Sequence, residues 1–249
     1  MRLGCLVSSL AFIVFFGLIG IFVIPSLLIY AIVYPFVKYP QDKFQFLSSV
    51  IYKIFFKIFP TIELDMQIQK KLPQSAVYIS THQSNLDYPI LGCIIKKYLI
   101  MTNLKFEKIP FISMVGHLIG VRYLDITNLS KVSKVYDEFE QMLKQDRNII
   151  FFAEGTRNNG KKLSPFKKGA FRLSYELNKP IVPIIISGSI DILSKGNFCF
   201  NTIKNRTIKV KMLEPIYPDK YTSQSDMLKS TYQIMQEENG KLNEKKSND

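Results

Sequence analysis

The chain has 249 residues and a net charge of +13, which is enough length for one well-packed domain with an appended segment. The charge does not indicate nucleic-acid binding, because no RNA- or DNA-binding motif accompanies it. Anionic lipid headgroups and acidic or phosphorylated substrates account for it equally well. The cysteines, Cys5, Cys93 and Cys199, are scattered and odd in number, which indicates a reducing compartment and neither a metal cluster nor a disulfide framework.

An uncharged run at the start of the chain predicts a membrane anchor. No charged residue occurs between Leu3 and Val37, and this run is much longer than the apolar core of a signal peptide, about 7–15 residues. One straight helix of that length would extend about 52 Å, against a hydrocarbon core of about 30 Å. We therefore expect either one span followed by a surface segment or a re-entrant hairpin. Lysines after the run outnumber the single Arg2 before it, which places the main domain on the cytoplasmic side if the anchor crosses.

The next segment, FQFLSSVIYKIFFKIF, has the period of an amphipathic helix. One face is apolar, with Leu47, Val50, Ile51, Ile54, Phe55 and Ile58, and Lys53 and Lys57 lie on another face, with Phe56 beside them. This pattern is typical of a helix at a membrane interface, and equally of a helix packed on a domain core. We assign residues 1–60 to a membrane anchor and an interfacial helix.

After Pro60 the sequence alternates short apolar strands with amphipathic helices. This alternation predicts an α/β fold over residues 61–238, with a mixed, largely parallel sheet flanked by helices. Strands are expected over Thr61–Met66, Ala76–Thr81, Tyr98–Thr102, Leu118–Leu124, Asn148–Ala153, Ile181–Ser187 and Thr207–Leu213. Helices are expected over Ile90–Lys96, Leu129–Lys144, Phe166–Leu177 and Asp226–Glu238. Residues 239–249 are expected to form a solvated tail.

One of the two histidines, His82, follows a predicted buried strand and precedes Asp87 by five positions. Residues five apart on a regular helix point about 140° away from each other. The two side chains can therefore meet only if His82 lies in the strand-to-helix turn and Asp87 near the helix start, a boundary that Pro89 favours. A carboxylate on one ring nitrogen would fix the tautomer and leave the other nitrogen free as a general base. A turn histidine capped for structure alone is the alternative.

No nucleophile accompanies this pair in the sequence. The chain has no G-x-S-x-G motif, and Cys93 lies within an apolar helix face, where a cysteine usually belongs to the core. A base at His82 would therefore act directly on a substrate hydroxyl.

The loop FFAEGTRNNGKK, residues 151–162, follows another predicted strand and is rich in glycine and basic residues. Lys162 stands where a nucleotide-binding P-loop needs a serine or threonine for magnesium, so we reject a nucleotide site. Ligands of α/β sheets bind at strand-end loops, and Arg157 can hold a phosphate through two parallel hydrogen bonds, with Glu154 orienting it. A surface loop with a structural ion pair is the alternative.

Taken together, these segments resemble the glycerolipid acyltransferases. THQSNLDYPIL resembles their H-x-x-x-x-D motif, FFAEGTRNNGKKLSPFKKGAF their E-G-T-R motif, and IVPIII their later V-P strand, with Pro183 as its marker. The resemblance covers roughly Ala76 to Ser187 and is strongest to the 1-acylglycerol-3-phosphate acyltransferase branch.

The resemblance implies a reaction and a set of binding residues. His82, oriented by Asp87, would take the proton from a lysophospholipid hydroxyl, which attacks an acyl thioester on coenzyme A or acyl carrier protein without an acyl-enzyme. The phosphate-bearing acceptor would be bound by Glu154, Gly155, Thr156 and Arg157. No metal or bound cofactor is implied, and the implied partners are the donor, the lysophospholipid acceptor and membrane lipids.

One departure from the family pattern leaves the acceptor headgroup open. The family usually has an arginine just after the aspartate of its acceptor-binding segment, where GVRYLDITN has Ile126. Arg122, about 13 Å back at strand rise, and Lys105 are possible substitutes. We expect lysophosphatidic acid, giving phosphatidic acid, or alternatively a lysophospholipid with a larger headgroup. A lipid-binding protein with a dead site and a nucleotide-binding protein are the competing classes, and the four intact motif residues argue against the first.

Overall fold

The structure, a computed structural model, describes residues 39–58, 62–103, 110–125, 127–160, 162–194 and 206–247. The predicted anchor between Leu3 and Val37, the substitute Lys105 and Ile126 all lie outside these ranges. None of the helices within them has both the length and the apolar composition that crossing a bilayer requires.

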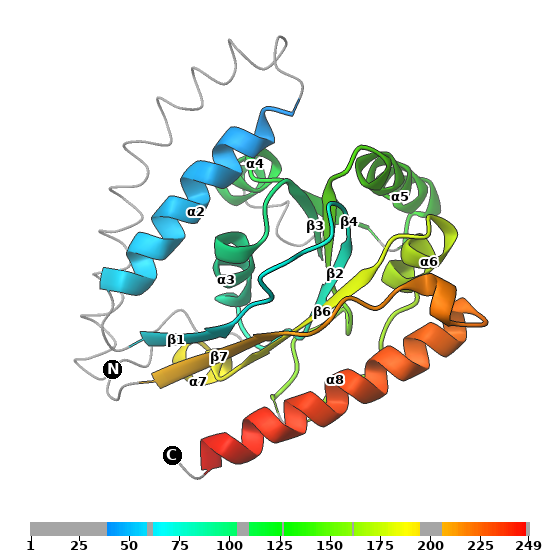
Figure 1. Cartoon of the computed structure of the whole chain (residues 1–249). Helices are drawn as coiled ribbons and strands as arrows, with labels where there is room; N and C mark the ends of the chain where they lie inside the picture. Colours follow the sequence, from blue (N-terminus) through cyan, green and yellow to red (C-terminus); the bar gives the residue numbers. More distant parts are fainter. Residues whose placement is uncertain are drawn as a thin grey trace.

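A seven-stranded sheet forms the centre of the described part of the chain (Figure 1). In chain order its strands are β1 (Ile62–Gln67), β2 (Val77–Ser80), β3 (Tyr98–Asn103), β4 (Val121–Leu124), β5 (Asn148–Phe152), β6 (Ile181–Ser187) and β7 (Arg206–Met212). Their spatial order is β1-β7-β6-β2-β5-β3-β4, and every neighbouring pair is parallel except β6 with β7. The predicted mixed, largely parallel sheet is confirmed.

Helices cover both faces of this sheet (Figure 1). One face carries α2 (Gln41–Ile58), α3 (Asp87–Ile94), α4 (Pro110–Leu118) and the short α7 (Ser189–Ile192), and the other carries α5 (Leu129–Lys144), α6 (Gly169–Glu176) and α8 (Gln224–Ser247). Every residue of β2 and β6 is buried, because a parallel strand with helices above and below has no solvent-facing side. This explains why these strands read as continuous apolar runs rather than alternating ones.

The helix α2 packs on the domain by one face and leaves a second apolar face exposed. Phe55 and Phe56 are buried in the core on its side of the sheet, and the buried Gln45 amide donates hydrogen bonds to the carbonyls of Tyr98, at 2.6 Å, and Ile119, at 3.1 Å. The exposed large apolar side chains of α2 are Phe46, Leu47, Val50, Ile54 and Ile58. The helix is therefore an integral part of the fold and also presents an apolar stripe at its surface.

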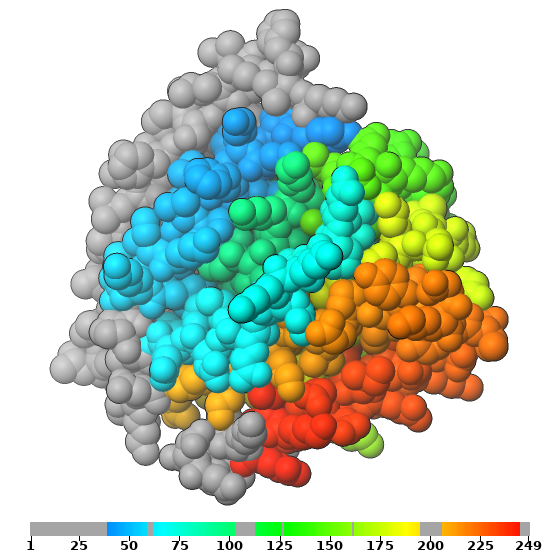
Figure 2. All heavy atoms as spheres, in the orientation of Figure 1, coloured from blue at the N-terminus to red at the C-terminus, as the bar shows by residue number. Residues whose placement is uncertain are grey.

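Four predicted boundaries differ from the structure by three residues or more. The helix α3 begins at Asp87, not at Ile90, and α6 begins at Gly169, not at Phe166. The other two are the start of β4 and the end of α8. The strand expected over Leu118–Leu124 begins only at Val121, because Leu118 ends α4 and Gly120, with a φ of 88°, turns the chain between them. The apolar run before it had no polar face to distinguish helix from strand. At the other end, α8 continues to Ser247 along the lower surface in Figure 2. Asn239 and Leu242, which the sequence placed in a solvated tail, are buried.

Candidate active site

The two motifs meet at the carboxyl ends of two neighbouring parallel strands. Ser80 at the end of β2 is paired in register with Phe152 at the end of β5. His82 follows two residues after the first strand, and the segment 154–157 follows two residues after the second. The backbone N–H of Asn158 donates to the carbonyl of His82 at 2.8 Å. The sheet register thus brings the H-x-x-x-x-D turn and the E-G-T-R loop into direct contact, as expected for a strand-end site.

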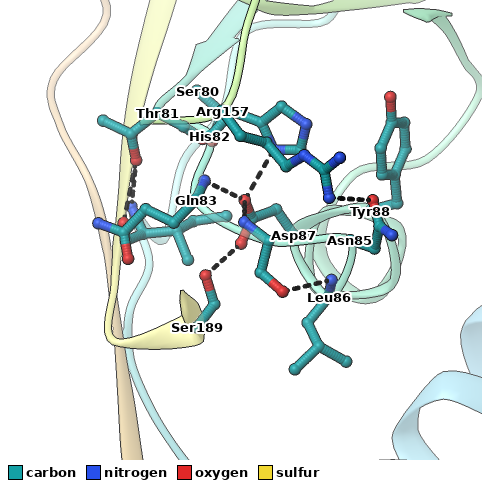
Figure 3. A network of polar contacts seen from close by, with 12 residues as sticks. Ser80, Thr81, His82, Gln83, Asn85, Leu86, Asp87, Tyr88, Arg157 and Ser189 are labelled. Carbon is teal, nitrogen blue, oxygen red and sulfur yellow. Dashed lines mark hydrogen bonds and ion pairs between the residues drawn. The ribbon is translucent and has the colours of Figure 1, made fainter. Parts of the chain in front are cut away.

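The predicted contact between His82 and Asp87 is present in the structure. The His82 Nδ1 and Asp87 Oδ2 atoms are 2.8 Å apart (Figure 3). His82 lies in the turn after β2 and Asp87 is the first residue of α3, which is the arrangement that the five-residue spacing requires. Because Nδ1 donates to a carboxylate, the other ring nitrogen, Nε2, is the one able to accept a proton.

The Asp87 carboxylate is completely buried and is held by four donors. Its Oδ2 accepts from the backbone N–H of Gln83 at 2.7 Å and of Ser84 at 2.9 Å, in addition to His82. Its Oδ1 accepts from the hydroxyl of Ser189 at 2.6 Å. Its position in the first turn of α3 adds the favourable field of the helix N-terminus. All four donors hold the carboxylate in a fixed position beside His82.

Two aromatic rings fix the plane of the imidazole. The Phe152 ring stacks on His82 with centroids 3.8 Å apart and planes 16° apart, and Tyr88 meets it edge-on at 5.7 Å. The Tyr88 hydroxyl donates to Thr102 at 2.7 Å, and burial raises the pKa of Tyr88 to about 12, so this phenol stays protonated. Neither ring was predicted from the sequence, although Phe152 and Tyr88 lie next to the motif residues, which was a usable signal.

Glu154 supports the loop that carries Arg157 instead of pairing with it. The side chain is buried, and its carboxylate accepts from the Asn158 amide at 2.5 Å and from the Ser164 backbone N–H at 2.6 Å. Burial raises the pKa of this carboxyl. No ion pair between Glu154 and Arg157 occurs among the described residues, so the alternative of a structural ion pair is not observed, and Glu154 orients Arg157 only through the loop that its hydrogen bonds hold. The assignment of Glu154 to the acceptor remains a prediction.

Arg157 lies beside His82. Figure 3 shows its guanidinium next to the imidazole, with Nη1 donating to the Asn85 side chain at 3.2 Å. Gly155 and Thr156 are exposed at the tip of the turn, and Gly155 has a φ of 69°, a conformation that favours glycine. The loop therefore presents one partly exposed guanidinium at the histidine, with most of its hydrogen-bonding capacity available.

The Arg122 side chain pairs with a carboxylate outside the candidate site. On β4, it forms a two-bond ion pair with Glu138 of α5, with Nε–Oε2 at 2.8 Å and Nη2–Oε1 at 2.7 Å. That side chain therefore points to the face covered by α5, whereas Phe152 under His82 belongs to the opposite core. We do not include Arg122 in the site. In the part of the chain that the structure describes, no cluster of three or more His, Cys, Asp or Glu residues is arranged to hold a metal ion.

The C-terminal helix braces the E-G-T-R loop from the far side. The Asn243 amide of α8 donates to the carbonyl of Gly160 at 2.8 Å, and its side-chain oxygen accepts from Ser187 at the end of β6 at 2.9 Å. Gly160 N–H in turn donates to the Asn158 side chain at 2.7 Å. This bracing was missed because it joins positions more than 50 residues apart with no local pattern.

Several known proteins that are similar in sequence to this chain have the same name. A 1-acyl-sn-glycerol-3-phosphate acyltransferase of Escherichia coli is 31% identical over 149 residues, 59% of each chain. The chloroplastic enzyme BAT2 of Brassica napus is 30% identical over 166 residues, which are 66% of this chain and 48% of that protein. An enzyme of the same name from Haemophilus influenzae is 25% identical over 79% of this chain and 83% of that one. The match thus spans less than two thirds of the first two of these relatives.

The fold also matches a solved structure. The crystal structure of the 1-acyl-sn-glycerophosphate (LPA) acyltransferase PlsC from Thermotoga maritima superposes with a TM-score of 0.66 at 18% identity, over 82% of this chain and 79% of that one. A family model described as Acyltransferase matches residues 63–187, a range that includes both motifs and the strand β6. This chain therefore belongs to the acyltransferase family.

Proposed function

We propose that the protein is a membrane-bound acyltransferase that moves a fatty acyl group from an acyl thioester to the sn-2 hydroxyl of lysophosphatidic acid, giving phosphatidic acid. The observation that carries the proposal is the buried His82–Asp87 pair with the Arg157 guanidinium beside it. This arrangement places a positioned base, His82, and a group able to bind phosphate, Arg157, at the same edge of the sheet. The relatives' names support the same reaction.

The reaction proceeds by one proton transfer in each direction. His82 Nε2 takes the proton from the acceptor hydroxyl as its oxygen attacks the thioester carbonyl. The carbon–sulfur bond of the tetrahedral intermediate then breaks, and the imidazolium returns the proton to the departing thiolate, which leaves as a free thiol. Asp87 stabilises the imidazolium between the two steps. The buried carboxylate and the stacked Phe152 keep the ring oriented, so the base does not have to be reorganised during the reaction.

Arg157 recognises the acceptor's phosphate. Its planar guanidinium can donate two parallel hydrogen bonds to phosphate oxygens, which a lysine ammonium cannot do in the same geometry. A monoester phosphate carries more charge and exposes more free oxygens than the diester of a larger headgroup, which favours lysophosphatidic acid. The donor carrier, coenzyme A or acyl carrier protein, is the second substrate in this proposal.

Membrane attachment is part of the same proposal. The apolar stripe of α2, with Phe46 71% exposed and Ile58 59% exposed, supports contact with a lipid surface, since such stripes usually mark an interaction site. Lys53 and Lys57 belong to the same helix, and basic side chains near an anionic surface contribute about 1 kcal/mol each. We propose that this surface lies on the cytoplasmic side of the membrane. The cytoplasm is the reducing compartment that the scattered cysteines indicate, and the basic residues after the predicted anchor favour the same side.

The test is an acyl-transfer assay on the purified full-length protein with a panel of lysophospholipids and both donor carriers. Lysophosphatidic acid should give the highest kcat/KM, and preference for a larger headgroup would support the alternative acceptor. Arg157→Lys should raise the KM for the acceptor by about tenfold or more, since a buried or partly buried charged hydrogen bond is worth about 1.5–3 kcal/mol, and leave the donor's KM unchanged. Arg172→Lys is the matched control, because Arg172 is exposed and pairs with Glu176 on α6. Absence of transfer to every acceptor would refute the proposal.

A further inference from the structure

A serine remote in sequence completes the environment of the candidate base. Ser189 begins α7, 102 positions after Asp87, and its hydroxyl donates to Asp87 Oδ1 at 2.6 Å (Figure 3). Both side chains have no exposed surface. The other three donors to the carboxylate all bind Oδ2. Among the described residues, Ser189 is thus the sole hydrogen-bond donor to Oδ1.

Because three donors bind Oδ2 and Ser189 binds Oδ1, the orientation of the Asp87 carboxylate plane depends on Ser189. The torsion about the Cβ–Cγ bond of an aspartate is broad, so donors on one oxygen alone leave the plane free to tilt about that oxygen. The bond to Ser189 holds the second oxygen and removes this freedom. A tilt at Oδ2 would change the direction and length of its contact with His82 Nδ1, and therefore the direction in which Nε2 faces the substrate.

The corner that carries Ser189 is itself tied to the histidine turn. Gly188, with a φ of 95°, donates its N–H to the Gln83 side chain at 3.1 Å. Thr81 accepts from the Ile186 N–H at 2.8 Å and donates to the Ile186 carbonyl at 3.1 Å. The end of β6 and the turn after β2 are therefore one bonded unit, which fixes the distance from Ser189 to Asp87.

We propose that Ser189 is a positioning residue for acyl transfer, which acts through the second carboxylate oxygen of Asp87 to hold His82 in its proton-accepting orientation. The inference rests on the proposed function, because it assigns Ser189 to the same proton transfer. It does not give Ser189 contact with either substrate.

The experiment compares Ser189→Ala with Ser174→Ala in the full-length protein. Ser174 is an equally buried serine on α6 whose hydroxyl donates to the Lys179 carbonyl at 2.6 Å, so its replacement also removes a short hydrogen bond made by a buried serine hydroxyl. We expect Ser189→Ala to lower kcat by about tenfold to hundredfold, since small misplacements of a reacting group have effects of that size. The KM values for acceptor and donor should stay within about twofold, and Ser174→Ala should keep the wild-type kcat.

A double-variant cycle separates positioning from general destabilisation. In an Asp87→Ala background the serine has no carboxylate to hold, so adding Ser189→Ala should lower the residual kcat by less than about twofold. Ser189→Cys keeps the shape of the side chain, with a slightly larger atom, but replaces the hydroxyl by a weak donor. It should give a folded protein with an intermediate kcat, and it carries the test if Ser189→Ala does not fold.

Several results would overturn the inference. One is a wild-type kcat in folded Ser189→Ala or Ser189→Cys. Another is a decrease in the kcat of Ser174→Ala as large as that of Ser189→Ala. A third is that Ser189→Ala lowers kcat by the same factor in the Asp87→Ala background as in the wild type. These failures differ from failure of the proposed function, in which the wild-type protein itself transfers no acyl group to any lysophospholipid.

Discussion

Replacing Asp87 by asparagine removes the negative charge at the candidate base while keeping the shape of the side chain. The two backbone N–H groups of Gln83 and Ser84 both point at Oδ2, so the amide oxygen must occupy that position and the amide nitrogen must face Ser189, whose hydroxyl can turn to accept. The oxygen beside His82 Nδ1 then still accepts its hydrogen bond. The tautomer is kept, and the variant loses only the charge that stabilises the imidazolium.

The size of the loss follows from the distance between these groups. Unit charges about 4 Å apart interact by about 4 kcal/mol at an effective dielectric constant of about 20, and about 1.4 kcal/mol corresponds to a tenfold change in rate. With the contact between His82 and Asp87 at 2.8 Å, we expect Asp87→Asn to lower kcat by about 10³-fold. The KM for the acceptor should change little.

The assay is steady-state transfer by full-length protein on lipid vesicles, with acceptor and donor varied separately. Asp137→Asn, a change of an exposed aspartate on α5, is the control and should keep the wild-type rate. A loss of less than about tenfold in folded Asp87→Asn would refute this account of the imidazolium. So would a loss that falls on the acceptor KM rather than on kcat.

Two further predictions concern stability, both measured by urea unfolding. Burial raises the pKa of Glu154, so the folded state holds this proton more tightly than the unfolded state, and stability falls as pH rises through the raised pKa. Glu154→Gln should remove that part of the pH dependence, and an unchanged profile would contradict it. A methyl group added at Gly169 would collide with the Tyr136 hydroxyl, so Gly169→Ala should destabilise the protein by about 1–3 kcal/mol. Adding Tyr136→Phe should recover part of this loss, and no recovery would show that the collision is not the cause.

The predictable parts of the fold are those with a strong local pattern. The helix α5 has the bounds predicted for it, Leu129–Lys144, because its apolar face repeats at the helical period and the Asn128 side chain accepts from the Lys131 N–H at 3.2 Å as an N-cap. The strand β6 also has its predicted bounds. In contrast, no element was predicted over most of α4, and its last residue, Leu118, was assigned to the following strand, since periodicity cannot separate a buried helix from a buried strand in so apolar a sequence.

The contacts of the candidate site also include some that a local sequence pattern predicts and some that it does not. The His82–Asp87 contact could be predicted, because the spacing and Pro89 left only one geometry in which the two side chains meet. The contacts of Arg122 with Glu138 and of Ser189 with Asp87 could not. They depend on which strands become neighbours and on which face each side chain takes, and a single sequence contains no local signal for either. The assignment of Gly155 and Thr156 to the acceptor remains a prediction.

The most direct test of the central claim is the rate of acyl transfer to lysophosphatidic acid by full-length His82→Ala on vesicles, with His117→Ala as the matched histidine control. His117 lies at the end of α4, where its ring meets the Tyr123 ring edge-on with centroids 5.1 Å apart. We expect His82→Ala to lose about 10²–10⁴-fold in kcat, the usual effect of removing a general base, while its folding and vesicle binding match the wild type. His117→Ala should keep the wild-type rate. Near-normal turnover by folded, vesicle-bound His82→Ala would show that His82 is not the general base.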